Sequence, residues 1–432
     1  MHTDAIFALS SGRGRAGVAV VRVSGPGAAG ALRSVAGPEL PRPRMATLRK
    51  LTGPDGDAID DGLVLWFPSP ASFTGEDVAE FHVHGGRAVI GALLAVLGSI
   101  PGLRAAEPGE FTRRAVENGK FDLTQAEALA DLVNAETEGQ RQQALRQYGG
   151  ALTTLYEGWR AALIRAAAWV ESTIDFSDEE VPRGALEDAR SIIKDVLKEI
   201  RVHLEDARRG EILRDGFRLT VIGPPNSGKS SLVNALARRD VAIVSEIAGT
   251  TRDLLEVHLD LGGVPVIVTD TAGLRESSDP LEAEGIRRAL GQMDSADAVL
   301  LLLDATQPDQ FTRPLSVKPT LTVWNKADLQ LPSEGQAISV RTGAGMEGLT
   351  EAIRNIVQER MGDMEIVVPT RERHRNALGR VVMALESSFY AREPDLVAEE
   401  LRSALADLGR ITGRVDVEEV LGAVFKEFCV GK

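Results

Sequence analysis

The sequence of 432 residues lacks three features that would indicate a secreted or membrane protein. It has a single cysteine, Cys429, which rules out an intrachain disulfide and fits a reducing compartment. No apolar run approaches the roughly 20 residues that a membrane-spanning helix needs. The first residues, MHTDAIFALSSGRGR, have no basic segment ahead of an apolar stretch, so they do not predict a signal peptide. We therefore expect a cytoplasmic protein without a membrane segment.

Positive charge is also scarce, because 49 lysines and arginines stand against 63 acidic residues and give a net charge of −14. This balance argues against non-specific binding of nucleic acid by the whole surface. Residues 1–50 are the exception: eight basic residues against Asp4 and Glu39 make this segment +6 and leave −20 for the remainder. The basic segment fits either a site for an anionic ligand or an ordinary solvated face.

The chain is long enough for two or three domains, and its first two hundred residues already change in character. Apolar runs that alternate with Gly and Pro, such as residues 17–27 and 62–76, predict strands and turns, followed by a helix over 87–100. From about residue 122 the periodicity becomes helical, and Thr124 with Glu127 predicts a capping box. Further helices are expected until about Gly210.

An α/β unit follows between residues 217 and about 368, and helices return after it. Residues 254–261 and 264–270 flank a Gly-Gly pair and predict a hairpin. Residues 298–304 and 320–326 are continuous apolar runs, which are typical of the buried strands of a sheet with helices on both faces. The α/β unit therefore separates two helical stretches, which could pack together.

The strongest motif is GPPNSGKS at residues 223–230, which follows a predicted strand and opens a predicted helix. It matches the G-x-x-x-x-G-K-S phosphate loop, in which glycines let backbone N–H groups turn toward phosphates. Lys229 can reach the terminal phosphates, and the hydroxyl of Ser230 can bind Mg²⁺. A chance Gly-rich turn is a poor alternative in this context.

A second motif, NKAD at residues 325–328, ends the strand over 320–326. Asp328 can accept two hydrogen bonds from the N–H donors of guanine, which adenine does not offer, and Lys326 can lie over the base. Such paired groups discriminate strongly, since the wrong base leaves buried polar groups unpaired. A Ser-Ala-Lys element that flanks guanine in related sites is poorly represented, because Ser339 is followed by Val340 and Arg341.

Two segments between these motifs predict nucleotide switches. IAGTTRD (247–253) offers Thr251 as a second Mg²⁺ ligand, and DTAG (270–273) offers Asp270 for Mg²⁺ and the Gly273 amide for the γ-phosphate. Leu274 stands where Ras-like enzymes have the glutamine that orients water. Asn226 could hold a monovalent cation that replaces an arginine finger, with Arg252 and Arg275 as competitors, and the water could be oriented by Glu276, Asp279, Glu282 or Glu284.

With these motifs the chain resembles the MnmE (TrmE) family of GTPases that modify tRNA. The resemblance extends over nearly the whole chain through SFTGEDVAEFHVHGG, PGEFTRRAVENGKFDLTQAEALADL, DFSDEE and a C-terminal FCVGK. It implies an N-terminal α+β domain like tetrahydrofolate-binding domains over residues 1–118, which also forms a homodimer. It further implies a helical domain built from 119–213 and 369–432, with a Ras-like P-loop GTPase domain over 214–368 inserted in it.

The resemblance also assigns roles at the GTP site. It implies K⁺ bound by Asn226, Ser245, Ile247 and Thr250, Mg²⁺ bound by Ser230 and Thr251, and Lys229, Thr251 and Glu282 as catalytic residues, with Glu282 orienting water. The residues expected to contact GTP are Asn226, Ser227, Gly228, Lys229, Ser230, Ser231, Ser245, Glu246, Ile247, Ala248, Gly249, Thr250, Thr251, Asp270, Thr271, Ala272, Gly273, Asn325, Lys326 and Asp328.

A one-carbon donor is implied as well, a formyl- or methylene-tetrahydrofolate bound by Arg22, Glu80, Lys120 and Lys432, with Cys429 as a candidate catalytic residue. From the sequence alone, Arg22 is also compatible with a solvent-facing strand position, and His82 and His84 are more often structural than metal ligands.

The implied partners are tRNA and an FAD-dependent protein, MnmG, with which the chain would add a (carboxymethyl)aminomethyl group to carbon 5 of the wobble uridine. Two alternatives stay open, a ribosome-assembly GTPase and a GTP-controlled dimeric scaffold without one-carbon chemistry.

Overall fold

The computed structural model describes residues 2–12, 14–175, 184–239, 241–243, 256–270, 296–308, 320–362, 367–415, 424–425, 428 and 431. The chain divides into two compact units. Unit 1 comprises residues 1–130, 148–164 and 401–432, and unit 2 comprises residues 131–147 and 165–400. Each unit is described by itself below.

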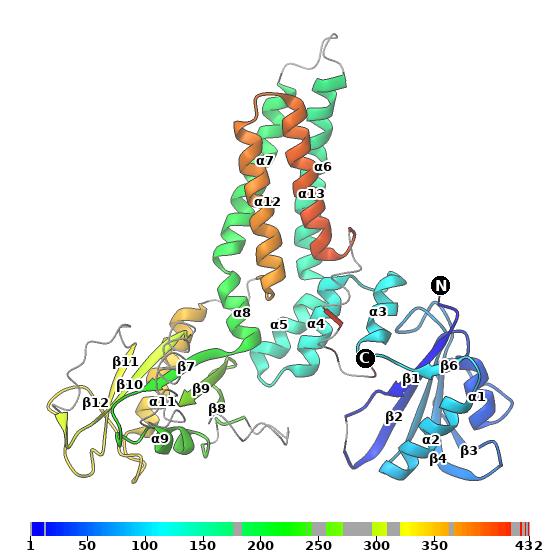
Figure 1. Ribbon diagram of the computed structural model, residues 1–432, viewed down its shortest axis with the longest axis horizontal. Coiled ribbons are helices and arrows are strands. Elements are labelled where there is room, and N and C mark those ends of the chain that lie inside the picture. Colours follow the sequence, from blue (N-terminus) through cyan, green and yellow to red (C-terminus); the bar gives the residue numbers. More distant parts are fainter. Residues whose placement is uncertain are drawn as a thin grey trace, which may run out of the picture. The chain divides into compact units, whose positions relative to one another are not determined.

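Unit 1 contains a six-stranded sheet in the order β3-β4-β5-β2-β1-β6. Its pairs are antiparallel except β1–β6. Helices α1 and α2 contribute to the core beneath the sheet, together with buried alternate residues such as Val21 and Phe81 (Figure 1). The elements are β1 (Ala5–Leu9), β2 (Ala16–Ser24), α1 (Ala28–Ala36), β3 (Thr47–Thr52), β4 (Ala58–Phe67), β5 (Val78–Gly85), α2 (Arg87–Ser99), β6 (Leu103–Ala105) and α3 (Glu110–Glu117).

Arg22 and Glu80 are directly opposite each other on β2 and β5. Because side chains alternate along a strand, these two lie on the sheet face opposite to their buried neighbours Val21 and Phe81. The pleat therefore brings two predicted site residues together, one from each strand.

Unit 2 contains the α/β part of the chain, a sheet in the order β12-β11-β10-β7-β9-β8. All pairs are parallel except the β8–β9 hairpin. The predicted strands, hairpin and phosphate-loop helix are confirmed, and the apolar strands form one core with α9 and α11. The elements are β7 (Phe217–Ile222), α9 (Lys229–Leu236), β8 (Glu256–Asp260), β9 (Pro265–Asp270), β10 (Ala298–Asp304), β11 (Leu321–Asn325), β12 (Gln336–Ala337) and α11 (Met346–Met361).

The remaining helices lie in the two predicted helical stretches, and four of them, α4, α5, α6 and α13, contribute residues to both units. Within unit 2, α7 and α12 lie side by side (Figure 1). None of the described helices is long and apolar enough to cross a membrane. The helices are α4 (Leu123–Asn134), α5 (Glu138–Tyr148), α6 (Ala151–Asp175), α7 (Ala185–Glu205), α8 (Ala207–Asp215), α12 (Glu372–Tyr390) and α13 (Pro394–Thr412).

Two local predictions are wrong. The capping box at the start of α4 is formed by Asp122 and Gln125: Gln125 N donates to Asp122 Oδ1 at 2.9 Å, and Asp122 N donates to Gln125 Oε1 at 3.1 Å. Thr124 lies inside the helix, where its hydroxyl donates to Asp122, so the stronger acceptor Asp122 takes the capping position. Helical structure also continues past Gly210 to Asp215, as α8.

Candidate functional site

The phosphate loop lies between β7 and α9, and its glycines are required by close backbone contacts. Gly223 has φ +153°, and a Cβ there would lie 2.1 Å from the carbonyl oxygen of Leu302. Gly228 has φ +99°, and its Cβ would lie 2.4 Å from Asn325 Nδ2. Side chains are excluded at both positions, so the loop can wrap tightly around phosphates at the N-terminus of α9.

Lys229 and Ser230 begin α9 directly after this loop. Lys229 Nζ donates to the carbonyl oxygens of Gly223 at 2.9 Å and Pro224 at 3.0 Å, which holds the ammonium group over the loop. The hydroxyl of Ser230 donates to Asp270 Oδ2 at the end of β9. The two oxygens meet where Mg²⁺ would be expected, and oxygen is the ligand atom that Mg²⁺ prefers.

The NKAD segment is fastened to the phosphate loop. Asn325 Nδ2 donates to the carbonyl oxygen of Ser227 at 2.8 Å, and Asn325 Oδ1 accepts from Val340 N at 3.1 Å. Asn325 is 4% exposed, so these bonds satisfy a buried amide. The segment that would recognise the base is thereby fixed relative to the segment that would bind the phosphates.

Asp328 has both carboxylate oxygens engaged by the segment that follows β12. Oδ1 accepts from the Ser339 hydroxyl at 2.6 Å, and Oδ2 pairs with Arg341. The hydrogen bond from Ser339 lowers the pKa of Asp328, and Arg341 lowers it further, which favours an ionised acceptor. The weak Ser339–Arg341 match to a guanine-flanking element thus lies beside Asp328.

A cavity of about 820 Å³ connects the two motifs. This volume lies within the range of small-ligand sites, roughly 300–1,000 Å³. Ser227 is fully buried and does not line the cavity. The lining consists of Pro225, Asn226, Gly228, Lys229, Ser230, Ser231, Asn325, Lys326, Asp328, Leu329, Val340 and Arg341.

The predicted switch residues lie outside the described residues, and so do some of the proposed folate and catalytic residues. They are Ser245, Glu246, Ile247, Ala248, Gly249, Thr250, Thr251, Arg252, Thr271, Ala272, Gly273, Arg275, Glu276, Asp279, Glu282, Glu284, Cys429 and Lys432.

A second polar cluster lies in unit 1, around Glu80. Arg22 Nη2 donates to Glu80 Oε1 at 2.8 Å, and the His82 ring nitrogen lies 3.1 Å from Glu80 Oε2. Burial would raise the pKa of Glu80, but the Arg22 charge and the hydrogen bonds from His82 and Arg22 lower it below its usual range. The Arg22 guanidinium carbon also lies 5.2 Å from the Phe73 ring centroid. The cluster combines an ionised carboxylate with a cation fixed beside it.

Lys120 lies close to the loop over residues 69–77, which carries Phe73. Its Nζ donates to the carbonyl oxygen of Pro70 at 3.0 Å. Arg22, Glu80 and Lys120 thus reach the same part of unit 1, through β2, β5 and this loop.

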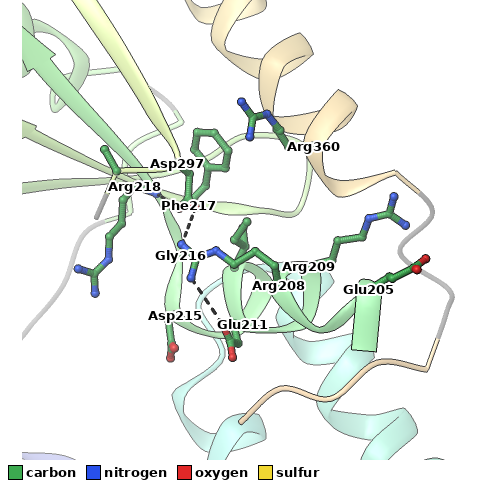
Figure 2. A pocket seen from close by; sticks show the side chains of 12 residues that line it. Glu205, Arg208, Arg209, Glu211, Asp215, Gly216, Phe217, Arg218, Asp297 and Arg360 are labelled. Carbon is green, nitrogen blue, oxygen red and sulfur yellow. Dashed lines mark hydrogen bonds and ion pairs between the residues drawn. The ribbon is translucent and has the colours of Figure 1, made fainter. Parts of the chain in front are cut away.

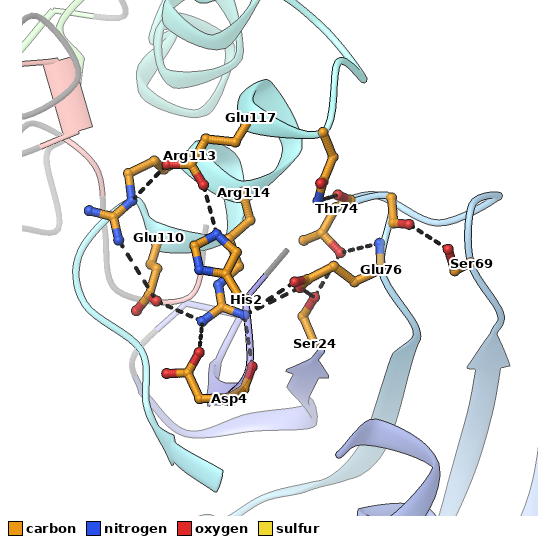
Figure 3. A network of polar contacts seen from close by, with 12 residues as sticks. His2, Asp4, Ser24, Ser69, Thr74, Glu76, Glu110, Arg113, Arg114 and Glu117 are labelled. Atoms are coloured by element: carbon orange, nitrogen blue, oxygen red, sulfur yellow. Dashed lines mark hydrogen bonds and ion pairs between the residues drawn. The ribbon is translucent and has the colours of Figure 1, made fainter. Parts of the chain in front are cut away.

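Figure 3 shows how Arg114, a fully buried residue of α3, anchors the same loop. Arg114 pairs with Asp4 at 2.9 Å, Glu110 at 3.0 Å and Glu76 at 3.3 Å. Glu76 in turn accepts from the Ser24 hydroxyl at 2.7 Å. A buried guanidinium therefore connects Asp4, directly before β1, with α3 and the loop.

His82 and His84 have acidic partners rather than a shared ligand position. His84 Nδ1 lies 2.8 Å from Asp60 Oδ1, while His82 lies against Glu80. Across the described part of the chain, no three His, Cys, Asp or Glu side chains come together as a metal cluster.

Another cavity, of about 770 Å³, lies in unit 2 beside α8 and the start of β7 (Figure 2). Arg208 is paired there with Asp297 at 2.6 Å and with Glu211 at 3.5 Å. Arg218 and Arg360 also line it, but Figure 2 shows their side chains pointing apart. None of the residues predicted for a site line this cavity, and its Arg208 is already paired with two carboxylates.

Two residues near the nucleotide cavity had no assigned role from the sequence. Arg341 lines the cavity and pairs with Asp328, although its segment matched the expected element poorly. Asp304 ends β10 beside Asn325 and pairs with Lys326. In the sequence, the only feature that points to Asp304 is its place as an acidic residue at the end of an apolar strand. In a parallel sheet, that position can lie beside the strand that ends in NKAD.

Comparisons with known proteins point to the same family along nearly the whole chain. Residues 5–120 match the family model described as GTP-binding protein TrmE N-terminus, and residues 123–429 match the MnmE helical domain. A protein called tRNA modification GTPase MnmE from Paramagnetospirillum magneticum is 51% identical over 441 residues, covering 100% of both chains. Proteins of the same name from Parvibaculum lavamentivorans and Rhodospirillum rubrum are 52% and 50% identical, covering 99% and 100% of this chain and 100% of their own length. The chain belongs to the MnmE (TrmE) family of tRNA modification GTPases.

Proposed function

We propose that the chain is a potassium-stimulated GTPase that modifies the wobble uridine of certain tRNAs. With the FAD-dependent partner MnmG it adds a (carboxymethyl)aminomethyl group to carbon 5 of that uridine, using a one-carbon unit from a tetrahydrofolate derivative. The observation that carries this proposal is the identity of at least 50% over the full length to relatives called tRNA modification GTPase MnmE.

GTP would occupy the cavity between the phosphate loop and NKAD, with its phosphates over α9 and guanine at Asp328. The hydrogen bond between the Ser230 hydroxyl and the Asp270 carboxylate brings two oxygen ligands together, which supports a Mg²⁺ site at the phosphates. Thr251 would be a further ligand. Bound Mg²⁺ would neutralise charge on the β- and γ-phosphates. Lys229 would contact the terminal phosphates, and Glu282 would orient the attacking water.

A K⁺ ion would take the place of an arginine finger. Asn226 lines the cavity, which supports a role for its side chain in holding the ion. Ser245, Ile247 and Thr250 would complete the site and thereby couple the ion to the first switch segment.

The folate derivative, 5-formyl- or methylene-tetrahydrofolate, would bind at the Glu80 cluster. The ionised Glu80 carboxylate could accept N–H groups of a pterin, while Arg22, Lys120 and Lys432 neutralise its acidic tail. Cys429 is a candidate for the one-carbon chemistry.

The assembly and organisation proposed here follow the family. Residues 1–118 form the folate-binding and dimerisation domain, residues 119–213 and 369–432 form the helical domain, and residues 214–368 form the GTPase domain. The protein works in the cytoplasm as a homodimer that associates with MnmG and tRNA.

The experiment that tests the cation is GTP hydrolysis in KCl and in NaCl at equal ionic strength, for the wild type, Asn226→Ala and a matched control, Asn234→Ala. Asn234 is exposed on α9 and does not line the cavity. We expect a marked K⁺ stimulation, on the order of 10³-fold if the ion fully replaces an arginine finger, which is lost only in Asn226→Ala. Equal rates in both salts for the wild type would contradict the proposal and make Arg252 or Arg275 the leading alternative.

A further inference from the structure

Asp304 is a buried carboxylate immediately behind the nucleotide cavity. It ends β10 and is aligned in the parallel sheet with Asn325, the first residue of NKAD. It is 3% exposed and does not line the cavity itself. A buried charge is costly unless it is paired and hydrogen-bonded, so the partners of Asp304 indicate its role.

The two carboxylate oxygens of Asp304 have separate partners. Oδ1 accepts from the backbone N of Thr306 at 2.9 Å and from the Thr306 hydroxyl at 2.7 Å. Oδ2 accepts from Lys326 Nζ. Burial would raise the pKa of Asp304, but the hydrogen bonds from Lys326 and Thr306 outweigh burial and lower it. Asp304 is therefore ionised at neutral pH, and one of its two oxygens, Oδ2, binds the ammonium group of Lys326.

Lys326 is held at both ends. Its backbone has φ +66°, a left-handed conformation that is uncommon for a residue other than glycine. The following turn stabilises it, because the Lys326 carbonyl accepts from Leu329 N at 2.9 Å and from Gln330 N at 3.2 Å. The side chain lines the cavity, whereas the carboxylate that binds its ammonium group does not. The backbone and the ammonium group at the two ends of this side chain are thus both fixed beside the cavity.

We propose that Asp304 is a positioning residue for guanine nucleotides, which fixes the stem of Lys326 as the apolar surface against one face of the base. Without Asp304 the lysine would lose its anchor and regain rotamer freedom, which binding would have to remove again. The inference concerns nucleotide binding and is independent of the proposed tRNA and folate chemistry.

The test is a double-mutant cycle of GDP binding by titration calorimetry with Asp304→Ala, Lys326→Ala and the double variant. If Asp304 acts through Lys326, we expect each single change to weaken binding about 10-fold, and the double variant to bind no more weakly than Lys326→Ala. Additive losses, or unchanged affinity in Asp304→Ala, would overturn the proposal. Should Asp304→Ala fail to fold, Asp304→Asn completes the same cycle with nearly unchanged volume.

Two further measurements separate positioning from a structural role. Thr306→Val removes one hydrogen bond to Asp304 but leaves the bond to Lys326, so we expect less than a threefold loss of affinity. A loss as large as that of Asp304→Ala would show that Asp304 acts by holding the turn at Thr306 rather than by holding Lys326, which contradicts the proposal. The ratio of GDP to IDP affinity should also be retained in Asp304→Ala, because Asp328 reads the 2-amino group at the base edge. A collapsed ratio would mean that the whole base site had been distorted, which contradicts the proposal.

Discussion

His203 shows how one buried side chain makes stability depend on pH. It lies on α7 and is 7% exposed, near His374 of α12, which is 1% exposed. Burial, followed by the charge of His374, lowers the pKa of His203 to about 4, against the opposing effect of a hydrogen bond with the Val367 backbone. The folded protein therefore holds this imidazole neutral at pH values where the unfolded chain protonates it.

The contribution of His203 to the free energy of unfolding is fully present above about pH 6.5, the pKa of this side chain in the unfolded chain. It is lost as the pH falls toward about 4, the pKa of the same side chain in the folded protein. Between pH 7 and pH 5 we expect the wild type to lose roughly 2 kcal/mol of unfolding free energy that a His203→Gln variant does not lose. Urea unfolding of both proteins at pH 7, 6 and 5 measures the difference. Parallel pH profiles would exclude His203 as the source.

At the residue scale, the sequence predicts side chains whose chemistry depends on local spacing. The phosphate loop and NKAD are contiguous motifs, so roles for Lys229, Ser230 and Asp328 can be predicted from their neighbours alone. Asp304 could not, because its partner Lys326 reaches it across two parallel strands. Arg341 escaped assignment for a related reason, since its role depends on lying opposite Asp328.

At the element scale, patterns of polarity predict most helices and strands but miss buried charge. The β8–β9 hairpin and the apolar strands β10 and β11 agree with their patterns. Arg114, by contrast, is among the largest fully buried side chains, although arginine usually indicates a solvent-facing position. Only the convergence of three carboxylates from separate elements explains it.

This convergence predicts that Arg114→Ala is far more damaging than the same change at its neighbour Arg113. Removing Arg114 leaves Asp4, Glu76 and Glu110 without their common cation, and breaking a buried ion pair in this way costs roughly 3–5 kcal/mol. Arg113 is partly exposed and pairs only at 3.7–4.0 Å, so its removal should cost less than about 1 kcal/mol. Chemical denaturation of both variants provides the comparison, and equal losses would refute the network's role.

At the scale of the whole molecule, the sequence predicts the order of the α/β and helical segments, because their periodicities differ over long stretches. It does not predict how the helices contact the α/β part within unit 2. There, Gly139 N of α5 donates to the carbonyl oxygen of Gly263 in the β8–β9 turn at 3.2 Å. A Cβ on Gly139 would lie 2.4 Å from that oxygen, so the close approach requires glycine.

A connected path therefore runs from the phosphate loop to α5. Ser230 bonds to Asp270 at the end of β9, β9 pairs with β8, and their turn contacts Gly139. A ligand that binds only the folded state stabilises the elements around its site, and packed neighbours share that stabilisation. We expect Mg²⁺–GDP to slow amide hydrogen exchange in α9 and also in α5.

Gly139→Ala should separate these two responses, since the added methyl group pushes the turn away from α5 without touching the nucleotide cavity. Exchange mass spectrometry with and without Mg²⁺–GDP should then show protection of α9 but none of α5. Gly379→Ala is the matched control, because a Cβ at that position of α12 meets nothing within 4 Å. If α5 were protected equally in Gly139→Ala and in the control, the nucleotide would have to reach this helix by a route other than the β8–β9 turn.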